Sequence, residues 1–277
     1  MIELKDVDFA YSKNAYRVIS NMNLSMQKGH IYGLLGKNGV GKTTLLKLLS
    51  GLLYADRGTI HVMKDDASKR NPSMLQKLFL VPDDIKLLRV TPYQYVKLYG
   101  KYYPNFKDED FISYLRDFEV NPTMKLNTMS FGQRKKMYLA FAFACNTDIL
   151  MMDEPTNGLD IPSKHTFRKI LSAFDLTDKL VIISTHMVKD ISQLIDAILI
   201  LDNDSMLMNA TANEISKKLL FKEIIPGDRP IYSERTIHGE WGIVQNYTNE
   251  ESAIDIEMLF NAVLLNKELI TNIFNSK

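Results

Sequence analysis

The chain has 277 residues, which is enough for about two domains or one large one. Its 34 lysines and arginines nearly balance its 33 aspartates and glutamates, so bulk charge alone does not attach it to nucleic acid or to an anionic membrane. The composition, 45% hydrophobic and 24% charged, is that of a globular protein, and a single cysteine, Cys145, excludes an intrachain disulfide and a cysteine metal cluster.

The first eighty residues predict several strands around one helix. Alternation of apolar and polar residues indicates strands at 2–9, with one shift of face, and at 18–26. We also predict a buried strand at 31–35, a helix at 42–53, and strands at 58–62 and 77–81. The helix should turn five leucines inward: Leu45, Leu46, Leu48, Leu49 and Leu52.

The middle of the chain, residues 89–146, predicts helices and no strong strand. Thr91 followed by Pro92 is typical of a helix start, and that helix should run to about residue 103. Two further helices are expected, at 107–118 and 131–145. We interpret this region as a helical insert in an α/β domain, with Cys145 as a small core residue.

Alternation between strand and helix resumes after residue 146. Strands are predicted at 149–152, 180–184 and 197–201, with helices at 161–174 and from residue 211 onward. Alternating short strands and helices favour a mostly parallel sheet. A turn-rich segment at 226–230 predicts a boundary, and 255–274 has the spacing of one amphipathic helix.

These elements predict an α/β fold with a P-loop NTPase core and a mostly parallel sheet. An N-terminal antiparallel β subdomain and the helical insert at about 89–146 would belong to a domain spanning 1–221. Residues 222–277 would form a small C-terminal α+β appendix domain.

No segment of the sequence predicts insertion into a membrane. The most apolar stretch, 191–201, is interrupted by Gln193 and Asp196, and a bilayer span needs about 18–20 apolar residues. Residues 1–6 lack the basic and then apolar pattern of a signal peptide, so we expect none.

A phosphate-binding loop is predicted between the strand at 31–35 and the helix at 42–53. The segment matches the pattern G-x-x-x-x-G-K-[ST] through Gly36, Lys37, Asn38, Gly39, Val40, Gly41, Lys42 and Thr43. Glycines let backbone N–H groups surround phosphate oxygens, and the following helix offers its positive end to the same anion. In this pattern Lys42 reaches the β- and γ-phosphates, and the Thr43 hydroxyl holds Mg²⁺.

Two acids follow the apolar strand at 149–152. Ligands bind at the carboxyl ends of strands in open α/β sheets, which is where Asp153 and Glu154 would lie. Asp153 is predicted to bind Mg²⁺, and Glu154 to orient or deprotonate the water that attacks the γ-phosphate.

Three further segments narrow the class of protein. Ser130, Phe131, Gly132 and Gln133 precede a helix about twenty residues before Asp153. The segment 153–160 then continues to Asp160, and Ser-Thr-His at 184–186 follows the next apolar strand. In this order and spacing, residues 1–220 resemble the ATP-binding subunit of ABC transporters.

The resemblance implies a role for each matching residue. Two such domains pair head to tail with two ATP molecules at their interface. Tyr11 would stack on adenine, and residues 36 to 44, including Thr44, would surround the phosphates. Ser130, Phe131, Gly132 and Gln133 would form the signature segment that contacts the partner's ATP. Asp160 would lie in the loop between the two sites, and His186 would contact the γ-phosphate as a third catalytic residue beside Glu154 and Lys42.

The chain departs from the family pattern at two positions. Phe131 stands where the signature segment usually has its first glycine, so some backbone freedom is lost. Asp83 stands where the family usually has a glutamine that senses Mg²⁺ and the attacking water. Asp83 could bind Mg²⁺ directly or repel ATP, and we expect it to weaken or slow coupling to the membrane partner.

The resemblance also implies partners and a location. The expected partners are a separate transmembrane permease and a second ATPase, either an identical copy or a paralogue, with no nucleic acid. The chain would lie peripherally on the cytoplasmic face of the membrane, with a permease element docked near residues 83–103, where Tyr93, Tyr95, Tyr99, Tyr102 and Tyr103 cluster. The short chain, Phe131 and the appendix resemble ATPases of Gram-positive peptide and antibiotic exporters, such as those of the phenol-soluble modulin exporter type.

Other functions remain open at this point. The chain could serve an importer, or be a soluble relative that acts on the ribosome or on DNA. Ribosome-acting relatives carry two ATPase domains, and DNA-repair relatives carry a long coiled coil, whereas this sequence has one motif set and no long heptad run. A GTPase would need an Asn-Lys-x-Asp segment, which the sequence lacks.

Overall fold

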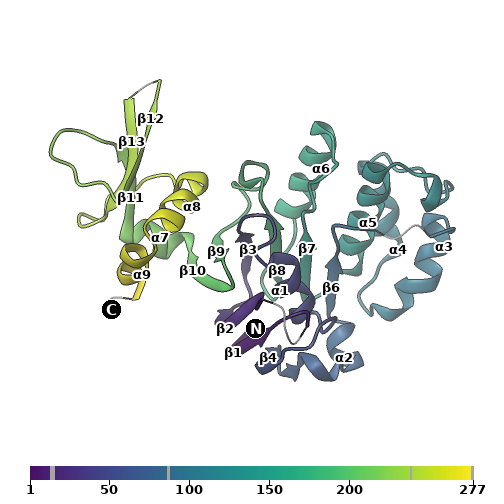
Figure 1. The fold of residues 1–277 in the computed structure, drawn as a ribbon. Coiled ribbons are helices and arrows are strands. Elements are labelled where there is room, and N and C mark those ends of the chain that lie inside the picture. The colour runs from purple at the N-terminus through teal and green to yellow at the C-terminus, as the bar shows by residue number, and fades with distance from the viewer. Residues whose placement is uncertain (13–15, 86–87, 238, 276–277) are drawn as a thin grey trace.

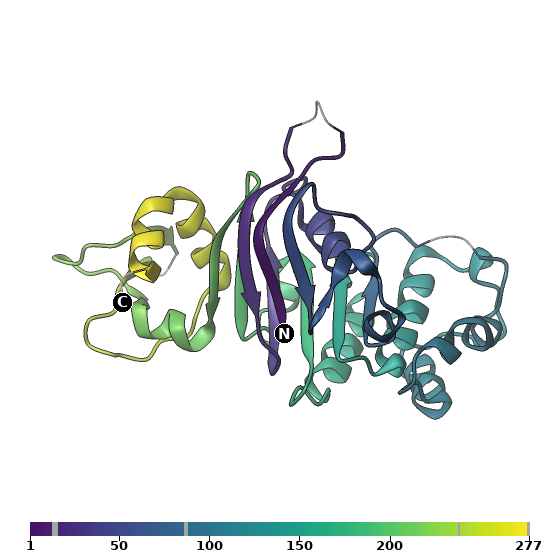
Figure 2. The same ribbon diagram turned by 90° about the horizontal axis from the view of Figure 1, so that it is seen from below.

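A computed structural model describes residues 1–12, 16–85, 88–237 and 239–275. The described chain contains three sheets, shown in Figure 1 with helices on their flanks. Figure 2 shows the same arrangement from below: the C-terminal part and the helical insert lie at opposite ends, with the strands of the first 211 residues between them.

The central sheet has six strands in the order β10-β9-β3-β8-β7-β6. Their bounds are β3 His30–Leu35, β6 Leu78–Val81, β7 Ile149–Asp153, β8 Leu180–Thr185, β9 Ala197–Asp202 and β10 Ser205–Thr211. All neighbours are parallel except β9 and β10, which pair antiparallel. Every residue of β7, β8 and β9 is buried, as expected for parallel strands covered on both faces.

The N-terminal sheet is antiparallel, as the sequence predicts. Its order is β2-β1-β4-β5, with bounds β1 Ile2–Phe9, β2 Ile19–Met26, β4 Arg57–Val62 and β5 Asp65–Asp66. The predicted shift of face in β1 is confirmed, because the register changes between Leu4 and Val7 around Asp6, whose φ is 49°.

The helix after β3, α1, is shorter than predicted, at Lys42–Leu49. Four of the five leucines expected on its inner side are buried, but Leu52 is 51% exposed. The reason is that Gly51 (φ +69°) turns the chain away after α1, and its missing Cβ would lie 2.6 Å from the carbonyl oxygen of Ala67.

Residues 89–146 contain helices and no strand, as predicted. The α-helices from just before the insert to just after it are α2 Pro72–Leu75, α3 Pro92–Tyr99, α4 Asp108–Asp117, α5 Phe131–Cys145 and α6 Ile161–Ser172. Phe141 of α5 is fully buried among Phe79, Tyr95 and Phe111, with ring centroids 4.9–6.1 Å away. Cys145 is buried at the end of α5, which confirms it as a core residue.

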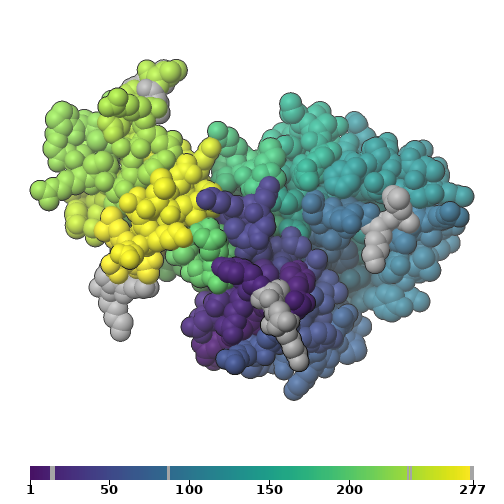
Figure 3. Space-filling model, in the orientation of Figure 1, coloured from purple at the N-terminus to yellow at the C-terminus, as the bar shows by residue number. Residues whose placement is uncertain are grey.

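The C-terminal part contains a third, antiparallel sheet in the order β11-β13-β12. Its elements are α7 Ala212–Lys218, β11 Leu219–Glu223, β12 Tyr232–Thr236, β13 Gly239–Gln245, α8 Ile256–Leu265 and α9 Lys267–Asn275. Figure 3 shows α8 and α9, in yellow, against the flank of the core. The division at residue 222 stays a prediction.

The single helix predicted at 255–274 is wrong, because two helices lie there. Asn266 ends α8 with φ −125° and ψ 48°, outside the helical region. Lys267 then begins α9 with its ammonium 2.5 Å from the Asp202 carboxylate at the end of β9. That ion pair holds α9 near the end of β9.

No helix in the described ranges is long and apolar enough to cross a membrane.

Candidate active site

The loop between β3 and α1 has the backbone that a phosphate-binding loop requires. Gly41 is the N-cap of α1 in the left-handed region, with φ 109°. A Cβ on Gly41 would lie 2.9 Å from a Val18 methyl group, and one on Gly36 would lie 2.6 Å from the carbonyl oxygen of Leu201. Glycine is therefore needed at both positions, for conformation at one and for close packing at both.

Lys42 places a buried cation at the centre of this loop. Its Nζ donates to the carbonyl oxygens of Gly36 (2.7 Å) and Lys37 (3.2 Å), and lies 4.0 Å from Glu154 Oε1. Burial lowers the pKa of Lys42, while Glu154 and Asp153 act in the opposite direction. The ammonium is thus poorly hydrated and poised to interact with a strongly anionic ligand.

Asp153 lies at the carboxyl end of β7, beside the start of α1. Its Oδ2 accepts a 2.6 Å hydrogen bond from the Thr43 hydroxyl, and its Oδ1 accepts one from the Ser184 hydroxyl. The carboxylate is buried and held from two sides. The structure therefore brings together Thr43 and Asp153, the two residues predicted to bind Mg²⁺.

The backbone at Glu154 turns sharply after the strand. Its φ of 45° lies in the left-handed region, which costs a non-glycine residue about 1–2 kcal/mol. The turn is held by the Glu154 N–H, which donates to the Ser184 carbonyl at 3.0 Å. Glu154 Oε1 lies 2.9 Å from His186 Nδ1, so the structure also joins these two predicted residues.

These groups line a pocket of about 410 Å³, here named the phosphate-loop pocket. It is lined by Tyr11, Val18, Asn38, Gly39, Gly41, Lys42, Thr43, Thr44, Asp83, Asp153, Glu154, Asn157 and His186. Tyr11 is largely exposed, and its hydroxyl lies 2.9 Å from Thr44 Oγ1. An aromatic ring in that position can pack against a flat ligand.

The signature segment lies elsewhere. None of its residues, Ser130 to Gln133, lines the phosphate-loop pocket, and Ser130 caps α5 by accepting a hydrogen bond from the Gln133 N–H. Asp160 caps α6 by accepting from Ser163 N–H at 2.9 Å, and it lies 3.6 Å from Lys136 Nζ. The structure therefore separates Asp160 and the signature segment from the other predicted site residues.

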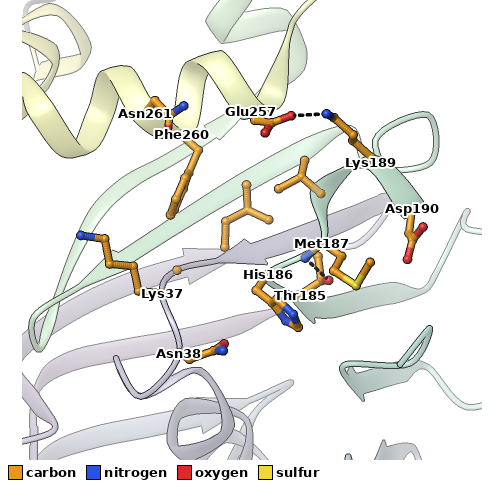
Figure 4. Close-up of a pocket in the computed structure, with 13 residues that line it drawn as sticks. Lys37, Asn38, Thr185, His186, Met187, Lys189, Asp190, Glu257, Phe260 and Asn261 are labelled. Atoms are coloured by element: carbon orange, nitrogen blue, oxygen red, sulfur yellow. Dashed lines mark hydrogen bonds and ion pairs between the residues drawn. The ribbon is translucent and has the colours of Figure 1, made fainter. Parts of the chain in front are cut away.

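A second pocket, the α8 pocket, lies on the other side of the phosphate loop. Figure 4 shows Phe260 and Asn261 of α8 above Lys37, with Glu257 bonded to Lys189 at 2.9 Å. His186 and Asn38 line both pockets. The C-terminal part of the chain thus reaches the edge of the candidate site.

Sequence reasoning missed three residues that the structure places around the site. Ser184 bonds to Asp153, Asn157 Nδ2 donates to Asp83 Oδ1 at 3.3 Å, and the buried Lys135 contacts both Asp83 and Asp153. A lysine within the otherwise apolar inner face of α5 was the one available signal for Lys135.

The donor set suits Mg²⁺ bound together with phosphate oxygens. Thr43 and Asp153 offer hard oxygen ligands 2.6 Å apart, the type that Mg²⁺ prefers. Within the described part of the chain, no group of three His, Cys, Asp or Glu side chains could hold a metal ion alone. This agrees with an ion that takes one or two protein ligands and completes its shell from a nucleotide and water.

A glycine-rich loop at a helix start, a buried lysine and an acid-ended parallel strand define the class of P-loop ATPases. The chain belongs to the ABC transporter family, whose model matches residues 19–157. It is the ATP-binding subunit of an ABC transporter and an ATPase.

Two relatives from Bacillus subtilis (strain 168) match most of the chain. The ABC transporter ATP-binding protein YtrB is 28% identical over 222 residues, covering 79% of this chain and 75% of YtrB. The linearmycin resistance ATP-binding protein LnrL is 28% identical over 226 residues, covering 79% and 72%. A solved ATP-binding subunit of an ABC transporter has the same fold, with a TM-score of 0.70 and 22% identity over 78% of this chain and 91% of that one.

Proposed function

We propose that this chain powers the export of peptides or drugs by hydrolysing ATP in the phosphate-loop pocket, as one half of a head-to-tail pair. The observation that carries the site assignment is the cluster at the end of β7. Glu154 Oε1 lies 2.9 Å from His186 Nδ1 and 4.0 Å from Lys42 Nζ, beside a loop built for phosphate.

Binding would use the loop and its two helix-start residues. Lys42 would exchange its backbone acceptors for the β- and γ-phosphate oxygens, and the N–H groups of residues 36–44 would donate to the same phosphates. Thr43 and Asp153 would hold Mg²⁺, which supplies charge neutralisation on the phosphates when bound. Tyr11, at the pocket mouth, would stack on the adenine ring.

Glu154 is the proposed general base. Its carboxylate would accept the proton of the attacking water and orient that water in line with the γ-phosphate. His186 would fix the carboxylate through the 2.9 Å contact of its Nδ1 and would offer its other ring nitrogen to the γ-phosphate. Because Asp153 is engaged by Thr43 and Ser184, it is not the proton acceptor.

A second copy, or a paralogue, would complete each site. The signature residues are turned away from their own pocket, and Ser130 and Gln133 are exposed at the start of α5. A serine hydroxyl at a helix N-terminus suits an anion, so this end of α5 can contact the ATP of a partner. Asp160, exposed at the start of α6, would lie between the two sites.

The permease would dock on a groove beside the helical insert. This groove, about 310 Å³ and here named the tyrosine groove, is lined by Pro72, Leu75, Gln76, Phe79, Tyr95, Tyr99, Tyr102, Tyr103 and Phe141. Tyr93, outside the lining, is 43% exposed on α3. Tyrosine suits a half-apolar interface, and docking here would place the chain peripherally on the cytoplasmic face of the membrane. Residues 86 and 87, within the predicted docking region, lie outside the described residues.

The direction of transport is proposed from the relatives. LnrL is named for linearmycin resistance, and removal of a drug from the cell is one way in which a transporter ATPase gives resistance. Export of peptides or drugs is therefore the proposed direction.

The test of the site is Glu154→Gln. We expect unchanged ATP affinity and turnover lower by about 10²–10⁴-fold, or about 2.7–5.4 kcal/mol at the barrier, because the amide cannot accept the proton. With ATP present, the variant should elute as a dimer from a sizing column. Glu119→Gln is the matched control, since Glu119 is an exposed glutamate that also has a positive φ of 55°. Unaltered turnover in Glu154→Gln would remove Glu154 as the base.

A further inference from the structure

Lys135 lies in the second turn of the signature helix α5. It is the most deeply buried charged side chain of the described chain, with 0% exposure. A lysine ammonium in such a place needs acceptors, because burial removes its water. Burial does lower its pKa, and Asp83 is the largest influence in the opposite direction. Lys135 does not line the phosphate-loop pocket, and the proposed function gives it no role.

The ammonium of Lys135 connects three segments of the chain. It donates to the carbonyl oxygens of Pro82 (3.4 Å), Asp83 (3.4 Å) and Asp153 (3.3 Å), and to Asp83 Oδ1 at 3.4 Å. The Pro82–Asp83 segment follows β6, and Asp153 ends β7. The start of the signature helix is thereby tied to the ends of β6 and β7, and β7 leads into the proposed base Glu154.

Asp83 is held by the same cluster. Its Oδ1 also accepts from Asn157 Nδ2 at 3.3 Å, so a cation and an amide from two different segments engage one carboxylate. Asp83 lines the phosphate-loop pocket, where an uncompensated negative charge would oppose a nucleotide.

The ring of Phe131 also contacts Lys135. The ring centroid lies 5.9 Å from Lys135 Nζ, within the range of a cation–π contact. The same ring packs on Gly158, where an added Cβ would lie 2.5 Å from two ring carbons. Phe131 and Asp83, the two departures from the family pattern, therefore both contact Lys135.

We infer that Lys135 and Asp83 act as one positioning unit, which couples the signature segment to the end of β7 and keeps the charge of Asp83 neutralised beside the nucleotide. The Asp83 carboxylate is then the partner of the Lys135 ammonium and not a ligand of Mg²⁺. A shift of the segment after β6, such as permease docking would cause, would be transmitted through Lys135 to the signature segment that faces the partner's ATP. This rests on the proposed assignment of the phosphate-loop pocket.

The test is a double-mutant cycle on ATP turnover by the full chain, with Asp83→Asn, Lys135→Met and both together. Each single change leaves one charge without its partner, so we expect kcat to fall about 10-fold. The double variant has neither charge and should recover to within about 3-fold of the unmodified chain. Lys77→Gln, which removes the exposed Lys77–Asp148 ion pair (3.9 Å), is the matched control and should leave kcat unchanged.

The Mg²⁺ dependence separates a positioning role from metal binding. We expect the Mg²⁺ concentration for half-maximal turnover, and the KM for ATP, to stay within about 2-fold in Asp83→Asn while kcat falls. A rise of 5-fold or more (about 1 kcal/mol) in the Mg²⁺ requirement of Asp83→Asn alone would assign Asp83 to the metal and overturn the proposal. The proposal is also overturned if the fall of kcat in the double variant equals the product of the falls in the two single variants.

If Lys135→Met does not fold, the Asp83→Asn variant alone tests the proposal. Asp83 is partly exposed, so we expect this variant to fold. Lower kcat with an unchanged Mg²⁺ requirement supports the unit, and unchanged kcat overturns it. Failure of the site assignment is recognised separately, because Glu154→Gln would then retain its turnover whatever the cycle shows.

Discussion

At the scale of single residues, the candidate site depends on charges placed where water is scarce. Lys42 is buried within the loop and bonded to two backbone carbonyls, so its charge has little hydration to lose when a phosphate arrives. A buried cation meets a triphosphate with less screening than an exposed lysine would. A single buried cation placed in this way explains how a chain of net charge +1 can bind a strongly anionic ligand.

We therefore predict that Lys42→Ala loses ATP affinity by at least about 100-fold, the loss expected for about 2.7 kcal/mol of charge-assisted hydrogen bonding. Titration calorimetry with ATP measures the affinity directly. Lys47→Ala, in the last turn of the same helix and outside the pocket lining, should bind as the unmodified chain does. Equal affinity of the two variants would contradict the assignment of the loop.

At the scale of elements, two helices of the insert begin with the same type of cap, but only one of them is proposed to contact nucleotide. Ser130 caps α5 and Thr91 caps α3, each in a capping box with a glutamine three residues later. Loss of either cap should cost about 1 kcal/mol of unfolding free energy. Only the Ser130 hydroxyl is proposed to contact nucleotide, through the partner copy.

We predict that Ser130→Ala and Thr91→Ala lower the urea midpoint of unfolding by similar amounts, while only Ser130→Ala lowers ATP turnover, by about 10-fold. Urea titration and a steady-state ATPase assay measure the two quantities on the same preparations. A parallel fall of turnover in both variants would show that Ser130 acts through helix stability alone.

The elements also show how far the sequence could predict this protein. The predicted bounds of the helix at 131–145 are confirmed, and the structure shows a capping box at its start, while β1 with its shift of face followed from alternation. The helix at 255–274 was wrong because amphipathic spacing continues across Asn266, where packing of Lys267 on Asp202 divides it. Local pattern cannot report a contact between residues 65 positions apart.

The same limit applies to the site. Lys42, Asp153, Glu154 and His186 could be found because each lies in a motif with a recognisable order. Lys135 could not be assigned, because its partner Asp83 lies 52 residues away and only the packing of α5 against the ends of β6 and β7 brings them together. The role of a buried charged residue can be predicted only when both its burial and its partner are known, and the sequence alone gives neither for Lys135.

At the scale of the whole molecule, one apolar cluster runs from the helical insert through the central sheet to the C-terminal part. It includes Phe141 of α5, Ile183 of β8, Ile215 of α7 and Leu259 of α8. The ion pair between Lys267 and Asp202 adds a polar link between α9 and the end of β9. A unit as small as residues 222–277 rarely has a core worth more than about 3–5 kcal/mol, so its stability should depend on this continuity.

We predict that the insert and the C-terminal part unfold in one transition, and the chain carries one natural probe at each end. Trp241, the only tryptophan, lies on β13, and Cys145, the only cysteine, is buried at the end of α5. Burial raises the pKa of the Cys145 thiol and shields it, so alkylation should require unfolding. In a urea series, tryptophan fluorescence and a short pulse of maleimide labelling should give coincident midpoints. A fluorescence change completed before Cys145 becomes reactive would instead show that the C-terminal part unfolds as a separate domain. Its core would then not depend on the contacts of α8 and α9 with β9 and β10.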